Sequence, residues 1–352
     1  MGQARKHQTF RHLLVGLAAT LLIGMMVLVG CKATPADYPP PTQLLLVVPQ
    51  QASLLARVEL AEILNDEEFA ELYQVIAAQD TDLPQTLDAA LDKIEYDTSI
   101  NLRDFTYLVV FAYASELLGS MEALQDNGDF PYCGVLVQGK LDERTFMQNI
   151  KRKIGRNLAT SDYRGFTIYA LTASPRQDHA SSIAFFANGQ MVIGTPRAVE
   201  NVIDIMAGLQ EPVSGTVCDL YRQLDDAYIK LVSSVPESVT MRIPSKMPVG
   251  PINLSLLSFR DIKYTTLTVT KNEAIINADA HLEFTNENSA KESGRLLWTA
   301  VIAGKHAVSD PDARELLSKI QTSRSGSSVS ITLAMAMSEI ERFTLTTLEE
   351  IR

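Results

Sequence analysis

The sequence predicts an α+β fold in which antiparallel sheets carry helices packed on one face. Asn188-Gly189 stands between two apolar runs and favours a tight hairpin, because both central residues of a type I′ turn need positive φ. Strands and capped amphipathic helices alternate along the chain, an order typical of antiparallel sheets with one covered face. The stretches 132–154 and 274–302 both pass from a strand to a capped helix, a pattern compatible with two ferredoxin-like or split β-α-β units.

In the first half of the chain, apolar runs between turn residues predict strands, and apolar stripes at helical spacing predict helices. Phe69, Leu72 and Ile76 form such a stripe. Pro196 suits the first position of a helix and Gly208 suits its end. We expect, in order, strands at 44–49 and 53–60, helices from 65 and 84, strands at 105–113 and 132–139, a helix capped by Asp142, strands at 166–171 and 183–193, and a helix at 196–208.

In the second half, two long apolar runs predict a second hairpin. Ser338 and Glu341 have the spacing of a capping box, which predicts the start of the terminal helix. The expected order is a helix leading into a strand over 221–232, a proline-rich connection, a hairpin of 262–269 with 274–284, helices at 286–303 and from Asp310, a strand at 329–335 and the terminal helix.

The 352 residues are enough for about two ordinary domains. Gly, Pro and Ser cluster between 208 and 216, which favours a boundary there. We therefore expect a first α+β domain at 44–210 and a second at 217–352.

The chain is acidic. Lys and Arg number 31 against 42 Asp and Glu, a net charge of −11. This charge argues against nucleic acid, or an anionic lipid surface, as the main partner.

The first 30 residues have the pattern of a secretory signal peptide. Arg5, Lys6 and Arg11 precede an uncharged, proline-free stretch at 13–30. Its length is also at the lower limit for a membrane-spanning helix, so an uncleaved anchor is the alternative. In either case the remainder faces an extracytoplasmic compartment.

This stretch ends in Leu28-Val29-Gly30-Cys31, which resembles the lipobox of bacterial lipoproteins. The resemblance implies that residues 1–30 are removed and that Cys31 is the lipid attachment residue. Two or three acyl chains, at about 0.8 kcal/mol per buried methylene, hold a protein firmly to a membrane. Residues 31–43 contain four prolines and form the expected tether. Lys32 favours the outer membrane, if the host has one.

Further passages at 47–49 with 53–61, 97–111, 132–142 and 165–195 together resemble a group of uncharacterised extracytoplasmic bacterial proteins, known only as a domain of unknown function. The resemblance implies an α+β fold. It brings no activity and no site residues.

One predicted strand carries the candidate metal ligands. Asn277, Asp279, His281 and Glu283 alternate with apolar residues and therefore share one strand face. Neighbours on such a face lie about 6.6–7 Å apart, too far for Asp279, His281 and Glu283 to converge on zinc without help from another strand. The favoured interpretation is the wet face of a half-covered sheet, so we expect no metal and no cofactor.

The two remaining cysteines are Cys133 and Cys218. Outside the cytoplasm such a pair can form a disulfide, and two separate buried thiols are the alternative. Neither has a Cys or His within four residues, so the spacing of a metal site is absent.

Motifs of hydrolytic or nucleotide-binding sites are missing: there is no G-x-S-x-G, no Ser-x-x-Lys, no phosphate-binding loop and no H-E-x-x-H. We expect a non-enzymatic binding or interaction module, held to a membrane through Cys31, that meets an unknown protein or small-molecule ligand in the cell envelope. One alternative is a carrier of lipid or another apolar ligand in a cavity between helices and sheet. Another is a hydrolase with a dispersed site around Asp279 and His281.

Overall fold

The structure is a computed structural model, and it describes most of the chain after residue 41. Cys31, the predicted signal peptide and the tether up to residue 41 lie outside the described residues, so the lipobox stays a prediction. Among the described helices, none combines the length and apolar character that crossing a membrane requires. The described residues are 42–78, 83–98, 100–115, 131–154, 158–171, 181–186, 189–249, 252–308 and 310–351.

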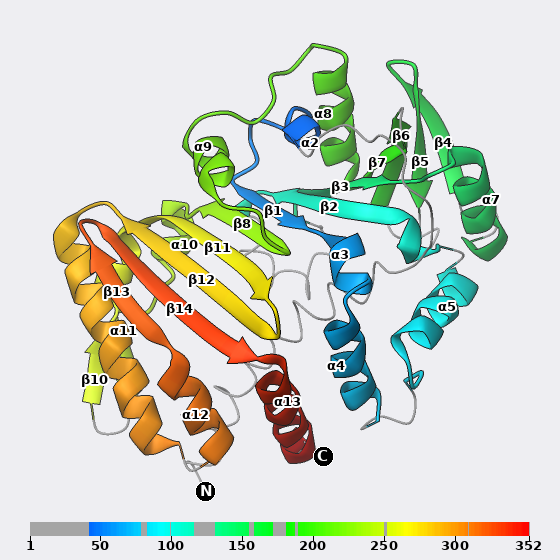
Figure 1. Cartoon of the computed structure of the whole chain (residues 1–352). Coiled ribbons are helices and arrows are strands. Elements are labelled where there is room, and N and C mark those ends of the chain that lie inside the picture. Colours follow the sequence, from blue (N-terminus) through cyan, green and yellow to red (C-terminus); the bar gives the residue numbers. More distant parts are fainter. Residues whose placement is uncertain are drawn as a thin grey trace, which may run out of the picture.

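The strands form an open antiparallel sheet, which confirms the predicted α+β class (Figure 1). Within the described residues it has 12 strands in the order β13-β14-β12-β11-β8-β1-β2-β3-β7-β6-β5-β4, and β9 and β10 pair separately. The strands are β1 (Leu54–Val58), β2 (Phe105–Ala112), β3 (Cys133–Gly139), β4 (Leu158–Tyr163), β5 (Phe166–Leu171), β6 (Ser181–Phe186), β7 (Gln190–Gly194), β8 (Ile229–Ser234), β9 (Lys246–Val249), β10 (Ile252–Ser255), β11 (Ile262–Asn272), β12 (Ile275–Phe284), β13 (Gln321–Ser325) and β14 (Ser328–Ala336).

Along the chain, helices lie before, between and after the strands of this sheet, and most of the predicted helices are present. Asp66 and Asn286 act as N-caps through their side chains. The helices are α2 (Thr42–Leu45), α3 (Leu60–Leu64), α4 (Glu67–Ala77), α5 (Leu87–Thr98), α7 (Glu143–Ile154), α8 (Pro196–Met206), α9 (Thr216–Gln223), α10 (Glu237–Thr240), α11 (Glu287–Ala307), α12 (Pro311–Lys319) and α13 (Met337–Ile351).

Around β2 and β3, helices cover both faces of the sheet, one more covered face than predicted there. Leu108 and Val109 of β2 point to opposite faces, and each is buried in its own core. We call these the Leu108 face and the Val109 face. Because β2 and β3 are apolar at nearly every position, both faces need cover. Residues of α2, α8 and α9 join the core on the Val109 face, and residues of α3, α5 and α7 join the core on the Leu108 face.

Strand β1 joins the two halves of the chain. It pairs with β2 on one side and with β8 on the other, so the sheet continues across the predicted boundary at 208–216. One split β-α-β unit is present, since β12 leads through α11 and α12 to β13 and β14 lies between them. The first half has a different connection, in which β3 is followed by α7 and the strands from β4 to β7, and β7 then pairs with β3.

The predicted strand at 44–49 is wrong. The chain forms α2 there, followed by turns. Leu44, Leu45 and Val48 are buried in the core on the Val109 face, together with residues of α8. Their spacing is helical, but the unbroken aliphatic run from Leu44 to Val48 conceals it.

The sequence reasoning missed β4 and β13. Both are edge strands of the sheet, and their central residues are small, polar or charged. Such residues lack the apolar alternation by which strands are found.

The predicted hairpin is confirmed by the antiparallel pairing of β6 with β7, in which Phe186 pairs with Gln190. Asn188 lies outside the described residues. Gly189 has φ 69°, the left-handed conformation for which glycine was expected.

Candidate functional site

The structure places Asp279, His281 and Glu283 together on the Val109 face of β12, as the alternation predicts. His281 lies opposite Thr266 of β11 and Ser330 of β14. Every residue of this surface is half-buried or exposed. The surface, which we call the polar sheet face, consists of Thr266, Thr268 and Thr270 of β11, Asn277, Asp279, His281 and Glu283 of β12, and Ser328, Ser330 and Thr332 of β14.

Serine hydroxyl groups form hydrogen bonds with the His281 and Glu283 side chains of this surface. His281 Nδ1 lies 2.8 Å from Ser330 Oγ. Glu283 accepts hydrogen bonds from Ser327, at 2.6 Å, and from Ser328. Within the described residues, no three His, Cys, Asp or Glu side chains come together to hold a metal ion. Strand spacing keeps Asp279, His281 and Glu283 apart, so the candidate ligands do not converge.

The contact between His281 and Ser330 bears on the hydrolase alternative. A serine nucleophile needs a base that is itself oriented by a third group. Asp279 is two residues from His281 on the same strand face, which places it about 7 Å away. His281 is exposed, so its contact with Ser330 has the geometry of an ordinary hydrogen bond on the protein surface.

Cys133 and Cys218 do not form a disulfide. Cys133 begins β3 and pairs with Ala112, whereas Cys218 lies in α9 and is buried on the Val109 face. Burial raises the pKa of the Cys218 thiol. The structure therefore corresponds to the alternative of two separate thiols.

A buried charged cluster, which the sequence reasoning missed, lies where β1 meets β2 and β8. Arg57 and Glu59 of the β1 region form an ion pair. The Arg57 guanidinium lies 4.3 Å from the centre of the Tyr107 ring, and Arg57, Tyr107 and Tyr221 are all at least nine-tenths buried. Lys230 of β8 donates to Asp226 at 2.8 Å.

Burial controls the ionisation of this cluster. It raises the pKa of Glu59 to about 7, an effect that the positive charge of Arg57 opposes. Burial also raises the pKa of Tyr107 and of Tyr221 to about 12. Among the described residues, Arg57 Nε and the Tyr107 hydroxyl have no hydrogen-bond partner. A charged residue within an apolar strand, as at Arg57, is the signal that could have revealed the cluster.

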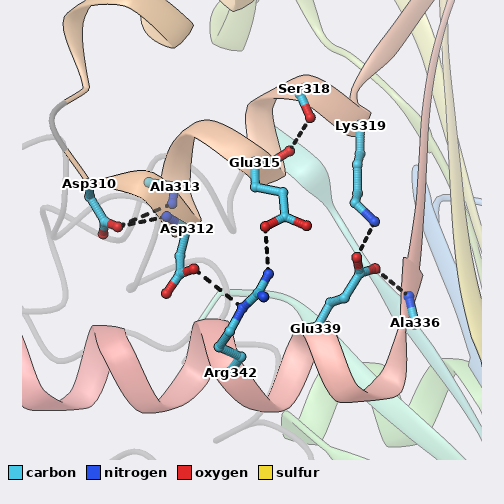
Figure 2. Close-up of polar contacts among 9 residues, drawn as sticks. All are labelled: Asp310, Asp312, Ala313, Glu315, Ser318, Lys319, Ala336, Glu339 and Arg342. Atoms are coloured by element: carbon cyan, nitrogen blue, oxygen red, sulfur yellow. Dashed lines mark hydrogen bonds and ion pairs between the residues drawn. The ribbon is translucent and has the colours of Figure 1, made fainter.

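A second charged cluster ties α12 to α13 (Figure 2). Arg342 binds Asp312 at 3.3 Å and Glu315 at 2.6 Å. Lys319 pairs with Glu339, which also accepts the backbone N–H of Ala336 at 2.8 Å.

The hydrogen bond from Lys319 and the one from the Ala336 backbone lower the pKa of Glu339.

The capping box predicted at Ser338 and Glu341 is shifted by two residues. Glu339 accepts the backbone N–H of Ala336 and so makes the return bond at the start of α13. A small recess opens beside the pairs, lined also by Leu316, Met335 and Phe343. Because its acidic and basic side chains pair with one another, the cluster fits a clamp between helices better than a ligand site.

The fold and its sites define an open antiparallel α+β protein. No family model matches the chain, and no curated protein matches it. Crystal forms I, III and IV of TP0453 are similar to it in structure, each with a TM-score of 0.44, at 12%, 10% and 12% sequence identity. The matches cover 89%, 88% and 88% of this chain and 98%, 99% and 96% of those chains. A similarity of this size is too weak to assign a function.

Proposed function

We propose that this protein is a membrane-anchored, extracytoplasmic binding or interaction module without enzymatic activity, and that the polar sheet face is its contact surface. The supporting observation is that the polar sheet face presents hydrogen-bonding side chains on three adjacent strands, all half-buried or exposed. Because neighbouring strands lie about 4.8 Å apart, these side chains form regular rows of hydrogen-bond donors and acceptors that a polar partner can contact. His281 stands at the middle of this surface and is exposed.

A photo-reactive phenylalanine derivative at position 281, in the full chain within living cells, tests the contact surface. We expect discrete cross-linked products after illumination, because the side chain at this position faces the partner. The same derivative at Arg295, an exposed position on α11, is the control. Products of equal yield at both positions, or none at position 281, would contradict the proposal.

Cys31→Ala tests the anchor. We expect the variant to incorporate no radiolabelled fatty acid and to accumulate as the unprocessed precursor, since the thioether can no longer form. Cys133→Ala should label as the unmodified chain does. Continued labelling of Cys31→Ala would show that the lipid is attached elsewhere or that the chain is not a lipoprotein.

The carrier alternative has one observation in its favour. On the Leu108 face of the second half, apolar side chains of β8, β11 and β14 are only half-buried. A face of this kind could hold an acyl chain. The residues are Ile229, Leu231, Leu267, Val269, Ile331 and Leu333.

The amount of lipid that co-purifies with the full chain distinguishes a lipid carrier from a binding module. A carrier would lose most of its co-purified, non-covalent lipid on Leu267→Glu, because the charge enters the apolar face. We expect equal amounts from the variant and the unmodified chain.

A further inference from the structure

We propose that β4 is a self-association strand, through which two copies of this chain pair their β4 strands antiparallel about a twofold axis at Thr160. The strand ends the sheet, and no described strand pairs with its outer side (Figure 1). Its residues from Ala159 to Asp162 are exposed. The partner is a second copy because the strand is complementary to itself, as the register shows.

The hairpin turn decides which backbone groups of β4 point outward. Arg164 and Gly165 have φ 55° and 81°, and Tyr163 pairs with Phe166, so the turn is a two-residue type I′ turn. In such a hairpin the residues that flank the turn exchange both backbone hydrogen bonds, and the bonding alternates from there. Odd-numbered residues of β4 therefore bond to β5. The N–H and C=O groups of Leu158, Thr160 and Asp162 point away from the sheet.

Among the described residues, this edge has none of the main features by which proteins block unwanted strand pairing. Lysine, arginine, proline, a bulge or a covering helix commonly protect an edge strand. At the opposite edge, β13 carries Arg324 and packs beneath α11. In contrast, β4 contains no lysine, arginine or proline, and Asp162 is its single charged residue. Its register with β5 is regular, without a bulge.

One register satisfies every outward group. If Thr160 lies opposite Thr160 of the second copy, then Leu158 lies opposite Asp162, and each of the three pairs exchanges two backbone bonds, about six in all. No like charges oppose each other in this register. A shift by four residues, which brings Asp162 opposite Asp162, would be destabilising. A symmetric, self-complementary contact of this kind closes as a dimer and does not extend into a fibre.

Cysteine substitution in the full chain, within its membrane, tests this register. In a hydrogen-bonded antiparallel pair the facing Cα atoms are about 5.5 Å apart, within the range of a disulfide. We therefore expect Thr160→Cys to form a disulfide-linked dimer under mild oxidation. Ser161→Cys is the matched control, because its nearest counterpart is about 8 Å away. Its dimer should be at least fivefold less abundant on a non-reducing gel.

Equal cross-linking at both positions, or no dimer of Thr160→Cys, would overturn the proposal. So would a cross-linked product with the mass of a different protein, which would mean that another partner occupies the edge.

Thr160→Pro provides a second test. Proline removes an N–H group that points outward, so the bonds between β4 and β5 remain. We expect Thr160→Pro to sediment as a monomer in detergent solution and Thr160→Val to sediment as a dimer. A monomeric Thr160→Val variant that is otherwise folded would refute self-association through this strand.

Discussion

Gly189→Ala is expected to lower the free energy of unfolding by about 3 kcal/mol or more. Gly189 has φ 69°, which strains any residue with a Cβ atom by about 1–2 kcal/mol. An added Cβ atom would also lie 2.0 Å from the carbonyl oxygen of Gly139. That oxygen belongs to the backbone at the end of β3, and the N–H of Gly139 donates to Gly189 O at 3.0 Å. Neither group can move without disturbing the contact between β3 and the hairpin of β6 and β7.

Gly208→Ala is the matched control. Gly208 has φ 72°, nearly the same conformation, but no atom lies within 4 Å of an added Cβ atom. It should lose only about 1–2 kcal/mol, from backbone strain alone. Urea denaturation of both variants measures the difference, which isolates the collision with Gly139. If both variants lost the same free energy, the close approach of the two backbones would be wrong.

Elements with local chemical signals could be predicted from the sequence. Asp66 caps α4, Asp142 accepts the backbone N–H of Thr145, and Pro196 begins α8. Each signal depends on residues within one turn, so the rest of the fold is not needed to interpret it. The alternation that places Asp279, His281 and Glu283 on one face of β12 is also local.

Contacts between distant residues could not be predicted in this way. Lys271 of β11 pairs with Asp66 before α4, across more than 200 residues of sequence. The continuity of the sheet between the two halves of the chain follows from the pairing of β1 with β8, which no local pattern encodes. The cluster around Arg57 and Glu59 depends on that same pairing, because it brings Lys230 beside β1.

Glu59→Gln is expected to remove much of the pH dependence of stability between pH 5 and pH 8. Burial raises the pKa of Glu59 to about 7 in the folded state, against 4.5 for an ordinary glutamate. The folded protein therefore binds a proton that the unfolded chain releases over this range. The stabilisation from that proton is complete below about pH 4.5 and is lost as the pH rises through 7. The loss amounts to about 3 kcal/mol.

The neighbouring charges determine what the variant retains. Arg57 and Lys230 lower the pKa of Glu59, whereas Glu62 and Asp226 raise it. Glutamine keeps an oxygen that accepts from Arg57 but cannot ionise, so the buried pair no longer carries a desolvated carboxylate. We expect Glu59→Gln to match the unmodified chain near pH 5 and to exceed its stability by about 2–3 kcal/mol at pH 8.

Urea denaturation at pH 5, 6, 7 and 8 measures this difference. Glu71→Gln removes an exposed carboxylate of α4 that does not act on the pKa of Glu59, and it controls for the change in net charge. Subtracting its curve leaves the contribution of burial at Glu59. Parallel curves for Glu59→Gln and the unmodified chain would mean that water reaches the carboxylate, and that β1 and β8 do not enclose it. Because β1 connects the two halves of the sheet, such a result would also mean that solvent reaches the region where the two halves meet.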